Sequence, residues 1–288
     1  MPLTPLIDSI IALLILVAFF LILFFVYVAY RMAKPPREVG KWTPEDFELN
    51  YEDFTVKADD GIEIRGWHVN KNSDCTIFLL HGYTVSRWTF YIKKMTEFLK
   101  DKNYNIVLFD FRAHGESGGK YTTVGDKELL DLKAVLSKFA TSKNCVVGYS
   151  MGGIIAIRAL TLPQITCGIA DSPPIHMDLT GKRGLKYFAN LPLWIYDISK
   201  PFFRLFAHGK MVNIIELADK INKPLLLIGG KKDPLVMESE IREFYDKNKE
   251  KNSDVEIWIT EAPHVRSVKI DEEAYRKRVM DFIDKRCG

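Results

Sequence analysis

Cysteine is scarce in this chain of 288 residues, and its four cysteines are widely separated. None of them forms a CxxC pair, the spacing that is typical of zinc ligands and redox dithiols. The first three lie beside or within apolar, strand-like runs; the four are Cys75, Cys145, Cys167 and Cys287. We therefore expect buried free thiols rather than a disulfide or a metal site, and free thiols fit a reducing compartment.

The sequence also has no stripe of basic charge, no Gly-x-Gly-x-x-Gly fingerprint and no internal repeat. Its 40 basic residues are interleaved with 37 acidic ones, for a net charge of +3. This pattern argues against a nucleic-acid partner, and the missing glycine spacing argues against a dinucleotide site. With 47% hydrophobic residues, the chain can bury one substantial core, and the part beyond the N-terminus suits a single α/β domain.

The N-terminus differs from everything that follows it. From Ser9 to Tyr30 there are 22 residues without a charge or a proline, enough for an α-helix to cross a hydrocarbon layer of about 30 Å. A cleaved signal peptide is the alternative, but the segment lacks a basic leading region and a small-residue cleavage site. We expect residues 1–30 to form a single transmembrane anchor.

Basic residues follow the expected span but do not precede it. Arg31, Lys34, Arg37 and Lys41 all lie on its C-terminal side, in a proline-containing linker over residues 31–46. The positive-inside rule then places that side in the cytoplasm. The sequence therefore predicts a single-pass membrane protein whose soluble domain, residues 47–288, is cytoplasmic.

From residue 47 onward, apolar runs alternate with helical patterns. A hairpin is expected around the turn at Asp59, Asp60 and Gly61. Six further strands are expected near residues 75–80, 105–110, 145–150, 167–172, 224–230 and 255–260. Helical spacing of apolar residues between most of these runs predicts an α/β fold, with a mainly parallel sheet covered by helices on both faces.

One short motif carries a chemical hypothesis. Residues 148–152, Gly-Tyr-Ser-Met-Gly, fit the pattern G-x-S-x-G at a strand-to-helix turn. A sharp turn of this kind presents the serine at the carboxyl edge of the sheet, and the glycines let the helix approach its neighbours. We interpret Ser150 as a nucleophile rather than an ordinary turn residue.

A serine hydroxyl needs a general base, and the base needs an acid that orients it. Asp233 follows the strand at 224–230, and His264 follows the strand at 255–260, so both belong on loops at the same sheet edge as Ser150. Taken singly, Asp233 is explained as a turn residue before a proline and His264 as a solvated loop imidazole. Their order after Ser150 favours a Ser-His-Asp triad.

An oxyanion hole is also expected, because acyl transfer develops negative charge on the former carbonyl oxygen. The strand at 75–80 ends in a glycine turn that would direct the backbone N–H of Tyr83 toward that of Met151. His81, in the same turn, is expected to be a structural hydrogen-bonding residue. The glycines of the turn at residues 109–119 are expected to shape the wall of the site.

The motifs at residues 81–84, 110–119, 148–153, 229–236 and 262–267 together resemble those of the α/β-hydrolase superfamily. The resemblance is to its esterase, lipase and serine-aminopeptidase-like members, and it covers roughly residues 47–286. It implies Ser150 as nucleophile, Asp233 and His264 as its partners, and the amides of Tyr83 and Met151 as oxyanion donors. No metal or organic cofactor is implied. Membrane-tethered members often face outward, so the family leaves the side of the membrane open.

The family usually inserts a cap where this chain has residues 175–220, a stretch dense in aromatic residues and leucine. The insertion is explained either as the packed core of a lid or as an apolar acyl pocket or membrane-facing surface. We expect a serine hydrolase that cleaves a carboxylic ester or thioester, with a small-molecule or lipid-like acyl substrate. The alternatives are an aminopeptidase-like peptide hydrolase and a non-catalytic scaffold tethered to the membrane.

Overall fold

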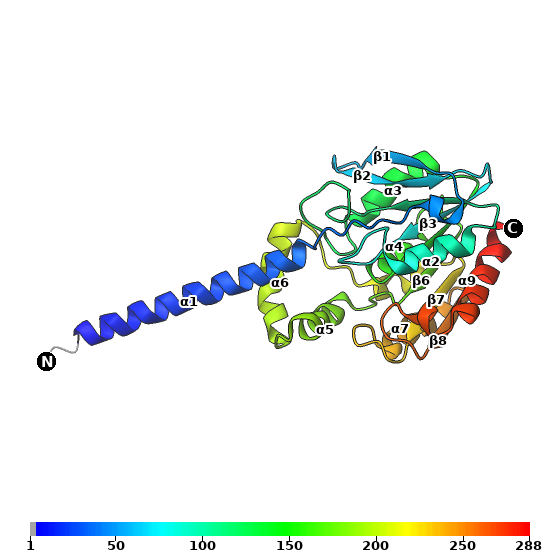
Figure 1. Ribbon diagram of the computed structural model, residues 1–288. Coiled ribbons are helices and arrows are strands. Elements are labelled where there is room, and N and C mark those ends of the chain that lie inside the picture. The colour runs from blue at the N-terminus through cyan, green and yellow to red at the C-terminus, as the bar shows by residue number, and fades with distance from the viewer. Residues whose placement is uncertain (1–3) are drawn as a thin grey trace.

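A computed structural model describes residues 4–288, and its main feature is one eight-stranded sheet (Figure 1). The strand order is β1-β2-β4-β3-β5-β6-β7-β8. The hairpin β1–β2 and the pair β2–β4 are antiparallel, and every other neighbouring pair is parallel. The strands are β1 Glu52–Lys57, β2 Glu63–Val69, β3 Cys75–Leu80, β4 Asn105–Phe109, β5 Lys143–Tyr149, β6 Cys167–Asp171, β7 Leu225–Gly230 and β8 Val255–Thr260.

Helices cover both faces of this sheet. Residues of α3, α4 and α7 pack in the core on one face, and residues of α2, α8 and α9 pack on the other. The helices are α1 Thr4–Ala33, η1 Pro44–Phe47, α2 Phe90–Leu99, α3 Glu128–Phe139, α4 Met151–Ala159, α5 Met177–Ala189, α6 Trp194–Ala207, η2 Ile214–Lys220, α7 Glu238–Lys249, α8 Ser267–Ile270 and α9 Glu272–Cys287. The predicted fold class is confirmed.

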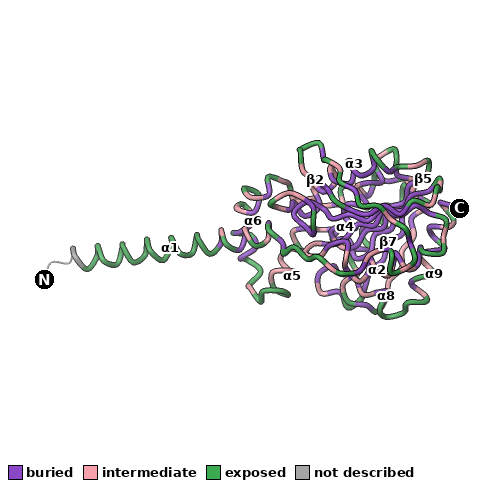
Figure 2. The backbone as a smooth tube through the Cα atoms, turned by 45° about the horizontal axis from the view of Figure 1, so that its top comes forward, coloured by how far each residue is buried: buried purple, intermediate pink, exposed green. Residues whose placement is uncertain are grey.

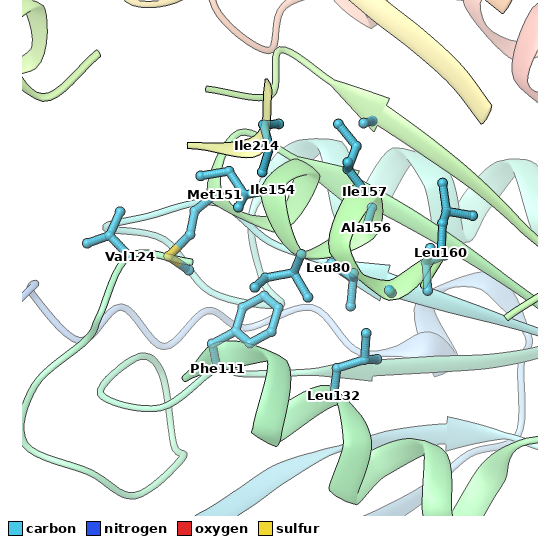
Figure 3. Close-up of a cluster of buried hydrophobic side chains, with 14 of the residues drawn as sticks. Leu80, Phe111, Val124, Leu132, Met151, Ile154, Ala156, Ile157, Leu160 and Ile214 are labelled. Atoms are coloured by element: carbon cyan, nitrogen blue, oxygen red, sulfur yellow. The ribbon is translucent and has the colours of Figure 1, made fainter. Parts of the chain in front are cut away.

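The central strands are buried on both faces, as their unbroken apolar runs predict. In β3, Phe78 and Leu80 point into the core shared with α4, whereas Ile77 and Leu79 point into the core shared with α2 and α9. Figure 3 shows the first of these cores around α4. Each such side chain contributes about 1.5–3 kcal/mol of hydrophobic stabilisation, so α4 is held firmly against the sheet.

The expectation of four free thiols is wrong for one pair. Cys75, the first residue of β3, forms a disulfide with Cys287, the last residue of α9, across a sequence separation of 212. Packing of α9 beside the sheet creates this proximity, and sequence spacing alone does not reveal it. Cys145 and Cys167 face each other across β5 and β6 as buried free thiols, as predicted. Because two of the four cysteines form a disulfide, the cysteines no longer support a reducing compartment.

The helix α1 leaves the domain at one edge and extends well beyond it (Figures 1 and 2). Within the described residues, Leu6–Ala33 is the one helix long and apolar enough to cross a membrane. Its side chains are exposed as far as Phe24, and burial begins at Phe25, where α1 meets α6. We call α5, α6 and η2, which follow β6 and precede β7, the cap.

Candidate active site

Ser150 lies in the sharp turn that joins β5 to α4. Its backbone has φ 53° and ψ −115°, a strained left-handed conformation for a residue with a side chain. A Cβ atom on Gly148 would lie 2.1 Å from the carbonyl oxygen of Gly152, and one on Gly152 would lie 2.1 Å from that of Leu80. The two glycines are therefore required for the turn to form.

The three predicted triad side chains meet at the carboxyl edge of the sheet. His264 Nε2 lies 2.8 Å from Ser150 Oγ, and His264 Nδ1 lies 2.7 Å from Asp233 Oδ2. The imidazole is thus held with Nδ1–H donating to the carboxylate and Nε2 available to accept the serine proton. This continuous chain of hydrogen bonds has the geometry of an activated nucleophile.

The Asp233 carboxylate is fixed by donors from its own loop. Its second oxygen, Oδ1, accepts hydrogen bonds from the backbone N–H groups of Leu235 and Val236, at 2.8 and 3.0 Å. The side chain is buried, and three hydrogen-bond donors hold its orientation. Asp233 therefore presents a fixed carboxylate oxygen to His264.

A cavity of about 350 Å³ opens in front of Ser150, and its walls are almost entirely apolar. Tyr83 and Met151, the predicted oxyanion donors, both line it. Among residues 4–288, neither of their backbone amides donates a hydrogen bond to another protein group. The remaining walls come from the cap, from the end of α1 and from neighbouring loops, including Met177, Leu185, Phe188, Phe203, Arg31, Met32, Val124 and Leu235.

Residues 77–227 match the sequence profile of the alpha/beta hydrolase family, which is more than half of the chain. The chain belongs to this family. It is 47% identical to an esterase of Pyrococcus furiosus, Pf2001, over 90% of this chain and all of that one, with a TM-score of 0.80. It is 31% identical to the uncharacterized protein YqkD of Bacillus subtilis over 80% of this chain and 78% of that protein. It is also 24% identical to an uncharacterized membrane protein of Saccharomyces cerevisiae, YNL320W, over 71% of this chain and 70% of that protein.

His81 has the structural role that the sequence predicts for this hydrolase. Its Nδ1–H donates to the Gly82 carbonyl at 2.7 Å, and its Nε2 accepts the Phe111 N–H at 2.9 Å. Complete burial lowers the pKa of His81 to about 4. The neutral imidazole therefore ties the glycine turn before Tyr83 to the end of β4.

This buried histidine makes the stability of the hydrolase depend on pH. In the unfolded chain His81 is protonated below a pKa near 6.5, whereas in the folded protein it stays neutral down to about pH 4. We expect His81 to remove about 3 kcal/mol of unfolding free energy as pH falls through this window. The measurement is urea unfolding across that range. The His81→Gln variant keeps a hydrogen-bond acceptor for the Phe111 N–H but does not titrate, so its unfolding free energy should fall less between pH 6.5 and pH 4 than that of the wild type. If the variant and the wild type lose unfolding free energy equally over this range, His81 is not the cause.

A buried network that the sequence did not predict lies behind the loop that carries His264. Ser172 Oγ donates to Asp171 Oδ1 at 2.9 Å and accepts the N–H of Val265, the residue after His264, at 3.2 Å. Tyr275 OH donates to Asp171 Oδ2 at 3.0 Å. Burial raises the pKa of Asp171 to about 6. The position of Asp171 at the end of β6, on the same sheet edge as Ser150, was the available signal.

The turn at residues 109–119 does not line the cavity in front of Ser150, contrary to expectation. Instead its backbone holds the linker that follows α1. The Arg37 guanidinium donates to the carbonyls of Gly115, Ser117 and Gly119. The turn thus fixes where the linker crosses the domain. Within residues 4–288, no group of three or more His, Cys, Asp or Glu side chains is placed to hold a metal ion.

Proposed function

We propose that this hydrolase is a serine esterase that cleaves a carboxylic ester or thioester through an acyl-enzyme. The observation that carries the proposal is the hydrogen-bonded chain from Ser150 through His264 to Asp233. The 47% identity to an esterase over the full length of that chain supports the ester as substrate class.

In the proposed mechanism, Ser150 Oγ attacks the carbonyl carbon while His264 Nε2 takes its proton. The amides of Tyr83 and Met151 donate to the oxyanion that develops. His264 then protonates the leaving alcohol or thiol, and the carbonyl re-forms as an acyl-Ser150 ester. Water, deprotonated by His264, attacks this ester; the bond between the acyl carbon and Ser150 Oγ breaks, and His264 returns the proton to Oγ as the acid leaves. Asp233 stabilises the imidazolium and keeps its orientation throughout.

The direct test is covalent labelling by a fluorophosphonate probe, which phosphonylates an activated serine. We expect the full-length protein to be labelled at Ser150, and the Ser150→Ala variant to remain unlabelled. Ser172→Ala is a matched control, because Ser172 lies near the same loop but contacts Asp171 rather than His264. A folded wild-type protein that takes no label would support a non-catalytic scaffold instead.

We further propose that the acyl group is apolar, because the cavity in front of Ser150 is lined by carbon-rich side chains. Leu185 and Phe188 of α5 line it, whereas the neighbouring Tyr187 does not. Replacing both lining residues by alanine should lower kcat/KM for a decanoyl ester about tenfold relative to an acetyl ester, since apolar contact area is lost. Tyr187→Ala is the matched control. Equal losses on both esters would indicate a folding defect.

We propose that α1 anchors the enzyme in a membrane, with the hydrolase domain on the cytoplasmic side. The support is the clustering of basic residues after the helix and the absence of Lys or Arg before it. Protease added to intact cells should therefore leave the domain uncut until lysis. A variant with reversed charge bias should place the hydrolase domain outside, where the protease can cut it. This variant combines Lys34→Glu, Lys41→Glu and a run of lysines inserted before Asp8. Arg37 is left unchanged because it is hydrogen-bonded to the 109–119 turn. Digestion of the wild-type domain in intact cells would reverse the orientation.

A further inference from the structure

The cap helix α6 carries an apolar stripe on its exposed side, flanked by the exposed Asp197 and Arg204, in addition to the apolar face that it buries. Trp194, Ile198, Pro201 and Leu205 recur at intervals of four, three and four residues, and all are exposed. The exposed fractions are 55% for Trp194, 43% for Ile198 and 68% for Leu205. The opposite face is buried in the fold through Ile195, Tyr196, Ser199, Phe203 and Ala207. A stripe of this kind needs a partner, because clustered apolar exposure on a protein surface marks an interaction site.

The position of α1 indicates what that partner is. At 1.5 Å per residue, about 20 residues cross a hydrocarbon layer, so a span that begins with the uncharged run at Ser9 ends near Val28, within the part of α1 that packs against the cap. Phe25 is the residue at which α1 meets the cap, and its ring lies 6.0 Å from that of Trp194. Figure 1 shows α6 running across α1, at the edge of the domain from which α1 emerges. The exposed stripe of α6 therefore lies at the depth where α1 leaves the hydrocarbon.

Charges around the same edge fit a layer of anionic head groups. A second cavity of about 470 Å³ lies beside the end of α1, and its charged lining residues are all basic: Arg31, Lys34, Arg37 and Lys120. The two acidic side chains in this part of the cap are paired, Asp197 with Lys182 and Asp178 with Lys200. Basic side chains next to a membrane surface are attracted to anionic lipid.

The end of α5 links this surface to the catalytic serine. Phe188 is 73% exposed, and it also lines the cavity in front of Ser150. Arg31 and Met32, the residues that follow the buried turn of α1, line the same cavity. An acyl chain that leaves the bilayer beside Phe188 would therefore enter the cavity without crossing bulk water.

We propose that the stripe of α6 and the end of α5 lie in the interfacial layer of the bilayer that α1 crosses, and that the cavity receives its acyl substrate directly from that bilayer. The docking surface consists of Phe188, Trp194, Ile198, Pro201 and Leu205, and its occupant is phospholipid with a share of anionic head groups. The route of the substrate rests on the proposed esterase function, whereas the docking of the cap does not.

The test places a nitroxide spin label at one position at a time in the full-length protein, reconstituted in vesicles of phosphatidylcholine and phosphatidylglycerol. Ile198→Cys and Leu205→Cys report on the stripe. The control is Lys277→Cys, at an exposed position in α9, a helix on the side of the domain away from α1 (Figure 1). The native cysteines do not compete, because they are disulfide-bonded or buried. We expect labels at 198 and 205 to be relaxed by oxygen and shielded from a water-soluble nickel complex, and the label at 277 to show the reverse.

Two outcomes would overturn the docking. In the first, the labels at 198 and 205 are as accessible to the nickel complex as the label at 277. In the second, their shielding disappears when the protein is diluted into excess lipid, which would show that a second copy of the protein, and not lipid, covers the stripe.

A kinetic experiment tests the proposed route of the substrate from the bilayer to the cavity. Ile198→Asp with Leu205→Asp should lower hydrolysis of a long-chain ester in vesicles about tenfold, as expected when two apolar side chains lose their lipid contact. Turnover of a soluble acetyl ester should not change. If the double variant and the wild type hydrolyse the ester in vesicles at equal rates, the proposed route is wrong. If the wild type hydrolyses neither ester, the proposed esterase function is wrong, and the docking of the cap is unaffected.

Discussion

We expect ester turnover to fall by about a thousandfold or more when Ser150 is replaced by alanine. In the proposed mechanism the serine supplies the nucleophile, and among the described side chains its Oγ is hydrogen-bonded to His264 alone, so the loss should be chemical rather than structural. His264→Ala and Asp233→Asn should have comparable effects, because the first removes the base and the second removes the anion that fixes its tautomer. Initial rates on a soluble ester at saturating and limiting concentrations measure all three.

A matched control is available in the cap. His176 lies outside the triad and pairs with Glu243 at 2.8 Å, so His176→Ala should retain near-wild-type turnover. Circular dichroism and thermal unfolding should show that each triad variant is folded. A folded His264→Ala protein that hydrolyses the ester at the wild-type rate would rule out the assignment.

Loss of the disulfide should be the largest single cost to stability. A cross-link that closes a loop of 212 residues restricts the unfolded chain, and loop-closure entropy for that length corresponds to about 5 kcal/mol. Cys75→Ser with Cys287→Ser should lower the unfolding free energy by up to this amount in urea titrations. The wild type should become equally unstable with reductant, whereas the double variant should not respond to it. A wild type that unfolds identically with and without reductant would show that the bond contributes nothing.

The meeting of Ser150, Asp233 and His264 could be predicted from the sequence, because the order of the strands determines where their loops lie. Ser150, Asp233 and His264 each follow a buried apolar run, and parallel strands bring such ends to one edge of a sheet. The glycines beside Ser150 could be interpreted in the same way, since only a tight turn explains them. These signals are local in the sequence, and the topology of the parallel sheet brings the three loops together.

Contacts between distant segments had no comparable signal. The Tyr83 hydroxyl donates to the Met32 carbonyl at 2.9 Å, which joins the loop after β3 to the end of α1. Neither residue type indicates a partner about 50 positions away. The disulfide between Cys75 and Cys287 was missed for the same reason, because widely spaced cysteines in apolar runs fit free thiols equally well. Only the packing of α1 and α9 against the domain decides these pairs.

The cross-link also turns most of the hydrolase into a covalent ring. Residues 75–287 form a closed circuit through the sulfur atoms, and this circuit contains all three triad residues and the whole cap. Helix α1, the linker and the hairpin β1–β2 precede the ring and lie outside it. One proteolytic nick between α5 and α6 should therefore leave a single band on a non-reducing gel and two bands after reduction, whereas a nick in the linker should separate α1 from the rest of the chain under either condition.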